Sequence, residues 1–238
     1  MEKSNIDEKI KLLTGSGMWH TQEVEGLPSV HLSDGPHGLR KQEEKERQNN
    51  VSLVSTCYPT ASALACSWDV TAAERLGRAV AKEAWNADVA VLLGPGINMK
   101  RSPLCGRNFE YFSEDPFLAG RLGAAYVSAA QGEDVAVSLK HFAANNQETN
   151  RQTANSQIDE RALREIYLSA FEYVVKTARP ATIMASYNRL NGYYACENRH
   201  LLTEILREEW GFDGVVISDW GACADLAKAV KAGMDLEM

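Results

Sequence analysis

From about residue 50 onward, short runs of apolar and β-branched residues alternate with longer stretches whose apolar residues recur at helical spacing. The longer stretches predict helices over 68–86, 159–178 and 198–210. The short runs predict strands, and each one leads into a polar cluster; they cover 29–32, 89–93, 135–139, 182–185 and 215–217. This alternation is typical of a parallel sheet with helical crossovers.

Residues at the ends of two predicted helices support this interpretation. The 159–178 helix stops just before Pro180, which cannot continue it. Asn198 is a candidate N-cap for the 198–210 helix, and Gly211 stands directly after that helix, where a left-handed residue often ends one.

Two architectures fit the alternation: an open doubly wound sheet and a (β/α)8 barrel. A dinucleotide-binding sheet is poorly supported, because its best candidate, Gly94-Pro95-Gly96, lacks the third glycine and does not open a helix. A barrel enzyme draws its site from the carboxyl ends of several strands, which is where the polar clusters lie. We therefore predict an α/β fold, a (β/α)8 TIM-type barrel.

The composition of the chain argues against several classes of protein. Of 238 residues, 45% are hydrophobic, so a large core is expected, and the net charge of -7 with no basic stripe argues against a nucleic-acid partner. The five cysteines are odd in number and widely spaced, which predicts reduced thiols. No apolar run is long enough for a signal peptide or a membrane span. We expect a soluble, cytoplasmic protein without a membrane partner.

A metal site is not expected. His31 and His37 lie on either side of a turn, and the chain has no HExxH motif or similar ligand pair.

Asp219 is the first candidate for chemistry. It follows the predicted strand 215–217 through Ser218, which would carry its carboxylate to the rim of the barrel beside Trp220. A carboxylate next to an indole suits a nucleophile that attacks a sugar ring. The alternative is an N-cap for a helix over 222–231.

Lys140 and His141 follow the strand 135–139 and bring a cation and an imidazole to the same rim. Charged groups form strong hydrogen bonds to sugar hydroxyls. A lysine at a strand end could instead form a Schiff base, and a lone histidine is more often packed than catalytic.

The loops at the rim hold further candidates. Asp34 lies in the turn SDGPHG, where it could approach a ligand or form an Asx-turn. Arg101 and Arg107 flank a loop that leads to Glu110; they could clamp hydroxyls or form an internal arginine–carboxylate network. The remaining donors and acceptors at this rim are Tyr187, Asn145, Asn146 and Glu148.

Five motifs resemble those of the N-terminal domain of family 3 glycoside hydrolases, in the bacterial β-glucosidase branch. They are SDGPHGLR, GPGINMKRSPLCGRNFEYFSEDP, KHFAANNQE, MASYNRLNG and GFDGVVISDWGA, in family order, and the resemblance extends over about 12–238. It implies a (β/α)8-type barrel, sometimes irregular in its first strands, and retaining hydrolysis of terminal β-D-glucosyl residues in carbohydrate metabolism. It implies no cofactor.

The resemblance also implies roles for individual residues. Asp219 would be the nucleophile and Trp220 would border the sugar site. The residues that would hold the sugar hydroxyls are Asp34, Arg101, Lys140, His141 and Tyr187. Arg107 and Glu110 would support the surrounding loop.

A retaining enzyme also needs an acid/base, which the β-glucosidase branch carries on a second domain. The N-acetylglucosaminidase branch has a KHFPGHGD-type motif instead, but this chain reads KHFAANNQE. We therefore treat 1–238 as the barrel domain alone, with the acid expected from a second domain or a partner chain. The ending MDLEM resembles a last barrel strand without its covering helix, and association with a second copy stays open.

Three hypotheses follow. The first is a retaining β-glucosidase barrel domain with Asp219 as nucleophile. The second is a barrel domain that binds glucosides with little or no turnover, because the general acid is missing. The third is a Schiff-base lyase or aldolase that uses Lys140.

Overall fold

A five-stranded parallel sheet forms the centre of the computed structural model, which describes residues 6–35, 37–42 and 51–238. Its strands are β1 (Leu32–Asp34), β2 (Val91–Leu93), β3 (Ala136–Phe142), β5 (Thr182–Ala185) and β8 (Val215–Ser218). All five predicted strands are confirmed, although the first begins at Leu32 rather than residue 29. The order β1-β2-β3-β5-β8 follows the chain without reversal, as in a barrel and unlike a doubly wound sheet.

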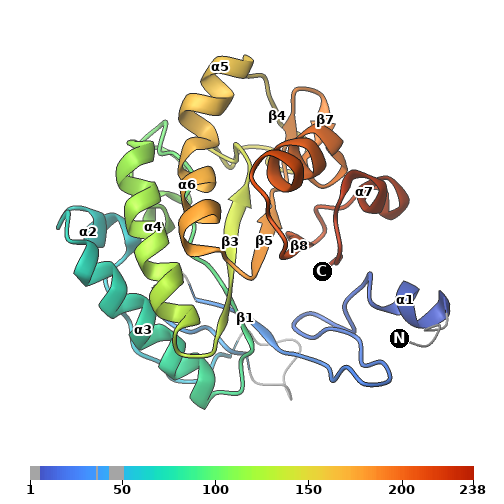
Figure 1. The fold of residues 1–238 in the computed structure, drawn as a ribbon. Coiled ribbons are helices and arrows are strands. Elements are labelled where there is room, and N and C mark those ends of the chain that lie inside the picture. The colour runs from blue at the N-terminus through green and yellow to red at the C-terminus, as the bar shows by residue number, and fades with distance from the viewer. Residues whose placement is uncertain (1–5, 36, 43–50) are drawn as a thin grey trace.

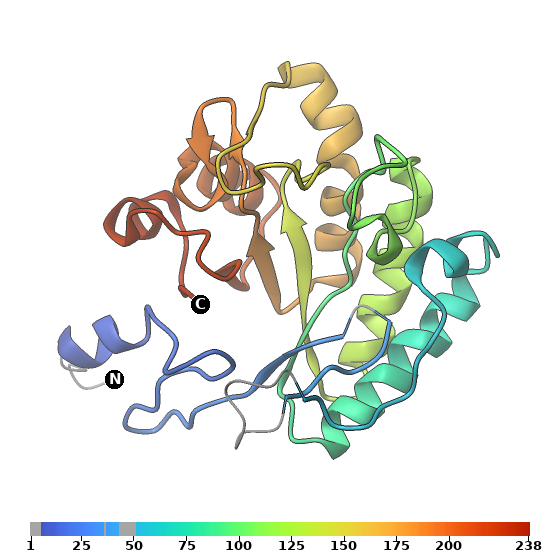
Figure 2. The same cartoon turned by 180° about the vertical axis from the view of Figure 1, so that it is seen from behind.

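The long helices pack side by side along one face of this sheet (Figures 1 and 2). They are α3 (Val70–Asn86), α4 (Pro116–Gln131) and α6 (Ser169–Ala178), with the short α2 (Ala61–Ala65) before α3. The predicted helix over 159–178 is confirmed in three consecutive pieces: α5 (Glu160–Ala162), a π-helical turn (Leu163–Tyr167) and α6.

Helix α4 was not predicted, although its start carries a clear signal. Asp115 accepts a hydrogen bond from the Phe117 backbone N–H at 2.7 Å, and Pro116 occupies the first turn, where its missing N–H costs nothing. Buried alanines and glycines on several sides of the helix blur its apolar period. Small residues let α4 pack closely between α3 and α6. Because they are buried on several sides, the sequence lacks the single apolar face that would predict this helix.

The C-terminal helical segments follow the predicted signals. Asn198 Oδ1 accepts from the Leu201 N–H at 3.1 Å and caps the π-helical segment His200–Glu209 (η4). Gly211 has a φ of +72° directly after it. The last helix, α7 (Leu226–Ala232), is capped by Asp225.

A smaller sheet lies in the loops beyond the carboxyl ends of β3 and β5, and short helical turns lie in the loops after β2 and β5. The sheet consists of β4 (Asn155–Ser156), β6 (Arg189–Leu190) and β7 (Tyr193–Tyr194). The turns are the 3-10 helices η1 (Asn108–Glu110) and η3 (Ala195–Glu197), and α1 (Ile6–Lys11) stands near the N-terminus.

The predicted barrel is not closed by regular strands in the described residues. Between β8 and β1 the chain forms single bridges: Leu236 pairs in parallel with Ile217, and Glu237 pairs in parallel with Thr14. The predicted last strand is therefore present only as a short bridge segment. The irregular first strands that the resemblance implied correspond to the bridged loops before Leu32.

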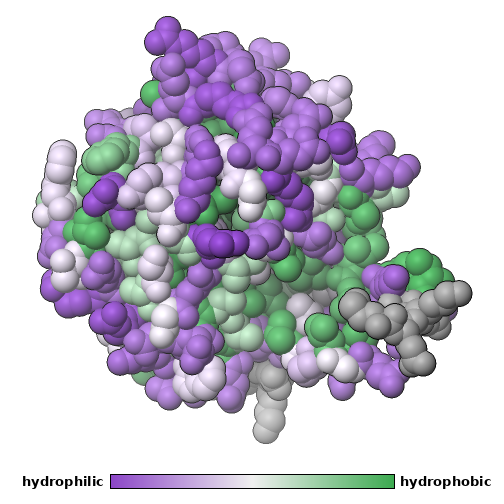
Figure 3. All heavy atoms as spheres, in the orientation of Figure 1, coloured by the Kyte–Doolittle hydropathy of each residue, from purple (hydrophilic) through white to green (hydrophobic). Residues whose placement is uncertain are grey.

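The surface is polar where the loops gather. Charged and polar side chains cover the end of the molecule around α5, and hydrophobic ones gather beside α1, where Ile6 and Ile10 are exposed (Figure 3). None of the helices in the described part of the chain is both long and apolar enough to cross a membrane.

The contact between α3 and α4 depends on Gly77, because a methyl group there would overlap the carbonyl oxygen of Tyr126. Gly77→Ala gains about 1 kcal/mol of helix propensity, but overpacking against rigid backbone costs up to about 3 kcal/mol. We expect the substitution to lower the free energy of unfolding by about 2 kcal/mol, measured by urea denaturation. Gly17→Ala is the matched control, since nothing lies within 4 Å of its Cβ. Equal stability of the two variants would show that α3 and α4 can move apart.

Candidate active site

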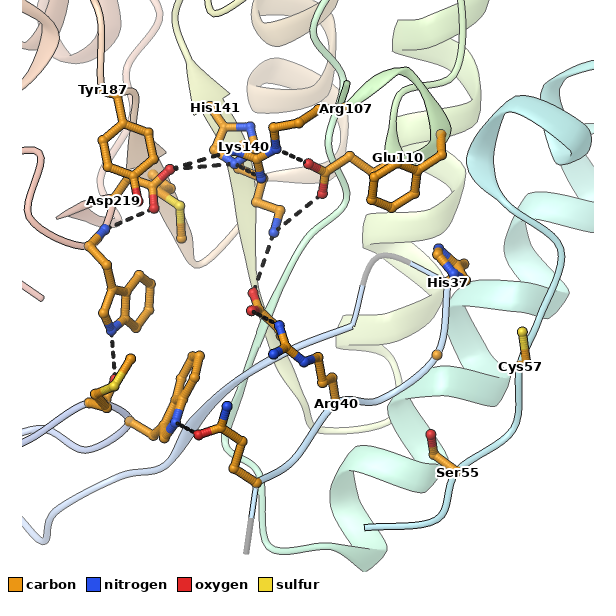
Figure 4. Close-up of a pocket in the computed structure, with 18 of the residues that line it drawn as sticks. His37, Arg40, Ser55, Cys57, Arg107, Glu110, Lys140, His141, Tyr187 and Asp219 are labelled. Carbon is orange, nitrogen blue, oxygen red and sulfur yellow. Dashed lines mark hydrogen bonds and ion pairs between the residues drawn. The ribbon is translucent and has the colours of Figure 1, made fainter. Parts of the chain in front are cut away.

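The carboxyl ends of the central strands surround a cavity of about 700 Å³ (Figure 4). Asp34 ends β1, and Lys140 and His141 lie in β3. Tyr187 is the second residue after β5, and Asp219 directly follows β8. The structure thus brings residues separated by up to 185 positions to one site, as a barrel rim does. The predicted site residues that line the cavity are Asp34, Arg107, Glu110, Lys140, His141, Tyr187, Asp219 and Trp220.

Asp219 is buried, with 7% of its surface exposed. Its Oδ1 accepts from the Trp220 backbone N–H at 2.8 Å. Its Oδ2 lies 3.9 Å from Arg107 Nη1 and 3.6 Å from His141 Nε2, and it has no hydrogen-bond partner among the described residues. The alternative of Asp219 as an N-cap is wrong, because the next helix starts at Leu226 under the cap of Asp225.

Lys140 sits between two carboxylates. Its Nζ lies 3.6 Å from Asp34 Oδ1 and 3.7 Å from Glu110 Oε2, and the side chain is almost fully buried. A Schiff base would require this nitrogen to leave both partners. The geometry instead suits an ammonium that donates to sugar hydroxyls or orients Asp34 and Glu110.

Arg107 and Glu110 form the internal network considered for this loop. The Arg107 Nε donates to Glu110 Oε1, and Nη2 contacts His141 Nε2 at 2.7 Å. Although burial lowers it, the pKa of Arg107 is raised overall by the neighbouring Tyr111 and Glu110. Arg107 is therefore a fixed cation that also faces the Asp219 carboxylate, a more central place than the supporting role predicted for it.

Arg101 is the predicted sugar-binding residue that the structure does not bring to the site. Its side chain does not line the cavity, and its guanidinium lies above the Tyr167 ring, 5.6 Å from the ring centre. The structure therefore does not bring Arg101 together with the other predicted hydroxyl-binding groups. Arg101 and Arg107 flank one loop, and the η1 turn aims only the second of them at the strand ends.

Burial and neighbouring charges shift the pKa values of three groups at the site. Burial, together with the cations Arg107 and Lys140, lowers the pKa of His141 well below its usual value, so the imidazole is neutral. Burial raises the pKa of Asp219 above its ordinary value of 3.8, an effect that Arg107 and Lys140 oppose. Burial and the Asp219 carboxylate raise the pKa of Tyr187, which keeps its hydroxyl protonated.

Several cavity residues escaped the sequence analysis, among them two arginines and a tryptophan. Arg40 Nη1 lies 3.7 Å from Asp34 Oδ2, the Arg151 guanidinium lies 4.2 Å from the centre of the Tyr187 ring, and the Trp19 ring packs 5.2 Å from that of Trp220. Arg40 ends the quoted motif SDGPHGLR, which was a usable signal. Neither Arg151 nor Trp19 lies at a strand end, so no pattern marked them.

The other polar residues predicted at the rim, Asn145, Asn146 and Glu148, form hydrogen bonds within the protein. Asn145 and Arg151 both donate to Glu148, and Asn146 donates to the Met99 carbonyl at 2.6 Å. These side chains brace the loop after β3. Pro36, in the turn after Asp34, lies outside the described residues.

Comparison with known proteins decides the family. The family model described as the glycosyl hydrolase family 3 N terminal domain matches residues 36–238. The chain belongs to glycosyl hydrolase family 3. Within this family the predicted motifs and the parallel α/β fold are confirmed together.

Curated family 3 relatives are far longer than this chain. A thermostable β-glucosidase B from Acetivibrio thermocellus is 52% identical over 100% of the chain and 32% of the relative. An exo-α-(1→6)-L-arabinopyranosidase from Bifidobacterium longum is 51% identical over 98% of the chain and 31% of the relative. The chain spans about a third of the length of these family 3 proteins.

Solved family 3 structures superpose closely on the fold. A β-glucosidase from Bifidobacterium adolescentis gives a TM-score of 0.93 at 49% identity, covering 99% of this chain and 34% of that one. β-glucosidase 3B from Thermotoga neapolitana, in complex with glucose, gives 0.94 at 42% identity, covering 99% and 35%.

Proposed function

We propose that this chain is the nucleophile-bearing domain of a retaining glycoside hydrolase that releases terminal β-D-glucosyl residues. The observation that carries the proposal is Asp219 Oδ2, a buried carboxylate oxygen that faces the cavity without a hydrogen-bond partner in the described structure. A β-glucosidase at 52% identity supports the substrate class.

In the proposed reaction, Asp219 Oδ2 attacks the anomeric carbon and forms a glycosyl ester while the bond to the leaving oxygen breaks. Lys140 and Arg107 donate to sugar hydroxyls, and Asp34 accepts from them. Trp220 offers an apolar ring at the cavity wall. A proton for the leaving oxygen, and later a base for water, must come from a second carboxyl group about 5 to 5.5 Å away.

The other described carboxylates of the cavity are poor candidates for that second group. Asp34 is paired with Lys140 and Arg40, and Glu110 is paired with Arg107 and Lys140. Both carboxylates are therefore already engaged in ion pairs inside the described cavity. We therefore propose that the acid comes from the part of the protein that the longer relatives have beyond this domain, or from a partner chain.

The test is intact mass after incubation with a 2-deoxy-2-fluoro-β-glucoside bearing a dinitrophenyl leaving group, which departs without a general acid. We expect one fluoroglucosyl adduct, mapped to Asp219 by peptide sequencing. An adduct at another residue would refute the assignment. A folded chain that binds glucose but forms no adduct would support the alternative, a glucoside-binding domain without turnover.

The formation rate of this adduct should depend on pH in one direction only. Because Asp219 attacks as the carboxylate, the rate should fall as pH falls through its pKa, which burial raises above 3.8. No decline is expected at higher pH, since this leaving group needs no acid. The rate constant should be measured between about pH 3 and 9, with circular dichroism confirming the fold at each pH. A midpoint at or below 3.8 would contradict the raised pKa.

A further inference from the structure

Tyr111 lies behind the site, between the η1 turn and the sheet. It pairs in parallel with Gly96, which also pairs with Lys140 in β3. The side chain is fully buried, and a Cβ on Gly96 would lie only 2.9 Å from the ring. The absence of a side chain at Gly96 thus creates the space that the Tyr111 ring occupies, and the ring can hardly move.

The Tyr111 hydroxyl contacts the far side of His141. Its oxygen lies 3.0 Å from His141 Nδ1, while Arg107 Nη2 lies 2.7 Å from His141 Nε2. A guanidinium has five N–H donors and no acceptor, so Nε2 must accept from it. A neutral imidazole carries one proton, which therefore sits on Nδ1 and points at the Tyr111 oxygen.

We propose that Tyr111 is a positioning residue for the reaction. By accepting the Nδ1–H of His141, it holds the ring in the tautomer that Arg107 selects, with the Nε2 lone pair toward Arg107 and the cavity. The expected effect on catalysis rests on the proposed function. The assignment of the His141 tautomer does not depend on it.

The opposite tautomer would damage the site in two ways. An Nε2–H would point at the N–H groups of Arg107, and it would also donate toward Asp219 Oδ2, 3.6 Å away. A hydrogen bond to this oxygen would stabilise the carboxylate before it attacks. With the proton on Nδ1, Oδ2 stays unpaired and Nε2 can accept from Arg107 or from a sugar hydroxyl.

The charge states agree with this arrangement. Burial and the nearby cations lower the pKa of His141 well below its usual value, so it carries a single ring proton. Burial raises the pKa of Tyr111 well above its usual value, so the hydroxyl is not ionised.

Nitrogen-15 NMR of the histidine-labelled chain tests the tautomer directly. The chain has five histidines, and the His141 signals are assigned by their loss in His141→Gln. We expect a protonated Nδ1 and an unprotonated Nε2 at neutral pH. A protonated Nε2 in the unsubstituted chain would overturn the proposal whether or not any variant folds.

Tyr111→Phe removes only the hydroxyl. Because Arg107 still donates to Nε2, the ring proton should stay on Nδ1, but we expect the His141 Nδ1 shift to change as its hydrogen bond is lost. The rate of fluoroglucosyl adduct formation should fall about tenfold, as the loss of one partner of a buried hydrogen bond does. Tyr126→Phe, at another buried tyrosine outside the cavity lining, is the control and should change neither. Unchanged shifts and rate in Tyr111→Phe would overturn the proposal. Adduct formation absent from the unsubstituted chain, with Nδ1 protonated, would count against the proposed function alone.

Discussion

Asp219→Asn is expected to reduce dinitrophenolate release from an activated β-glucoside on the order of 10⁵- to 10⁶-fold, the scale seen when an enzyme loses its nucleophile. The amide keeps the volume and can still accept from the Trp220 N–H, but its carbonyl oxygen cannot form a stable glycosyl ester. The release rate and the intact-mass adduct should disappear together.

Asp213→Asn is the matched control. Asp213 precedes the same strand, β8, but it is exposed and pairs only with the exposed Arg179 in the described structure. Such surface pairs contribute about 0–1 kcal/mol, so stability and rate should stay near those of the unsubstituted chain. If Asp219→Asn retained more than about a hundredth of the rate, another group would have to be the nucleophile.

The positions of Asp34, Lys140 and Asp219 could be predicted because each follows directly from a strand. A buried parallel strand is a continuous apolar run, and its carboxyl end must meet those of its neighbours. Lys140 also shows the limit of this reasoning. Its position was predictable, but the choice between a hydroxyl donor and a Schiff-base nucleophile needed the two carboxylates that the fold places beside it.

The directions of the loop arginines could not be predicted. Arg101 and Arg107 stand in the same loop with similar neighbours, yet one packs on Tyr167 and the other reaches Asp219. The pair of Arg107 with Glu110 is local, but both side chains are held by β3, Glu110 by Lys140 and Arg107 by His141. These contacts join distant parts of the chain, and a local sequence pattern does not show them. The family resemblance likewise implied a place for Arg101 in the site, whereas its side chain does not line the described cavity.

The sequence predicted a barrel, but it did not predict how the barrel closes. A (β/α)8-type barrel, sometimes irregular in its first strands, was expected, and β8 continues toward β1 only through single bridges at Leu236 and Glu237. An apolar ending such as MDLEM indicates burial, but it does not show how many residues pair. Asp34, Lys140, His141, Tyr187 and Asp219 lie on β1, β3, β5 and β8 or just after them, so the irregular closure leaves their arrangement intact.

The chain alone should discriminate strongly between leaving groups. Dinitrophenolate is stable without a proton, whereas the glucose released from cellobiose needs one as its oxygen departs. A missing general acid typically costs about 10²- to 10⁴-fold, so the ratio of kcat/KM for dinitrophenyl β-glucoside over cellobiose should exceed that of the longer relatives by this factor. Both values should be measured on the chain and on a family 3 β-glucosidase under the same conditions.

The second half of the reaction provides the decisive control. The glycosyl ester on Asp219 must be attacked by water, and without a base this step should limit turnover of the dinitrophenyl substrate. Azide needs no base, so its addition should raise the turnover rate and give β-glucosyl azide, with the configuration of the substrate retained. Asp219→Asn should show neither effect. Rapid cellobiose cleavage by the chain, unaffected by azide, would mean that an acid/base lies within these 238 residues, and the ion-paired Asp34 and Glu110 would then be the groups to test first.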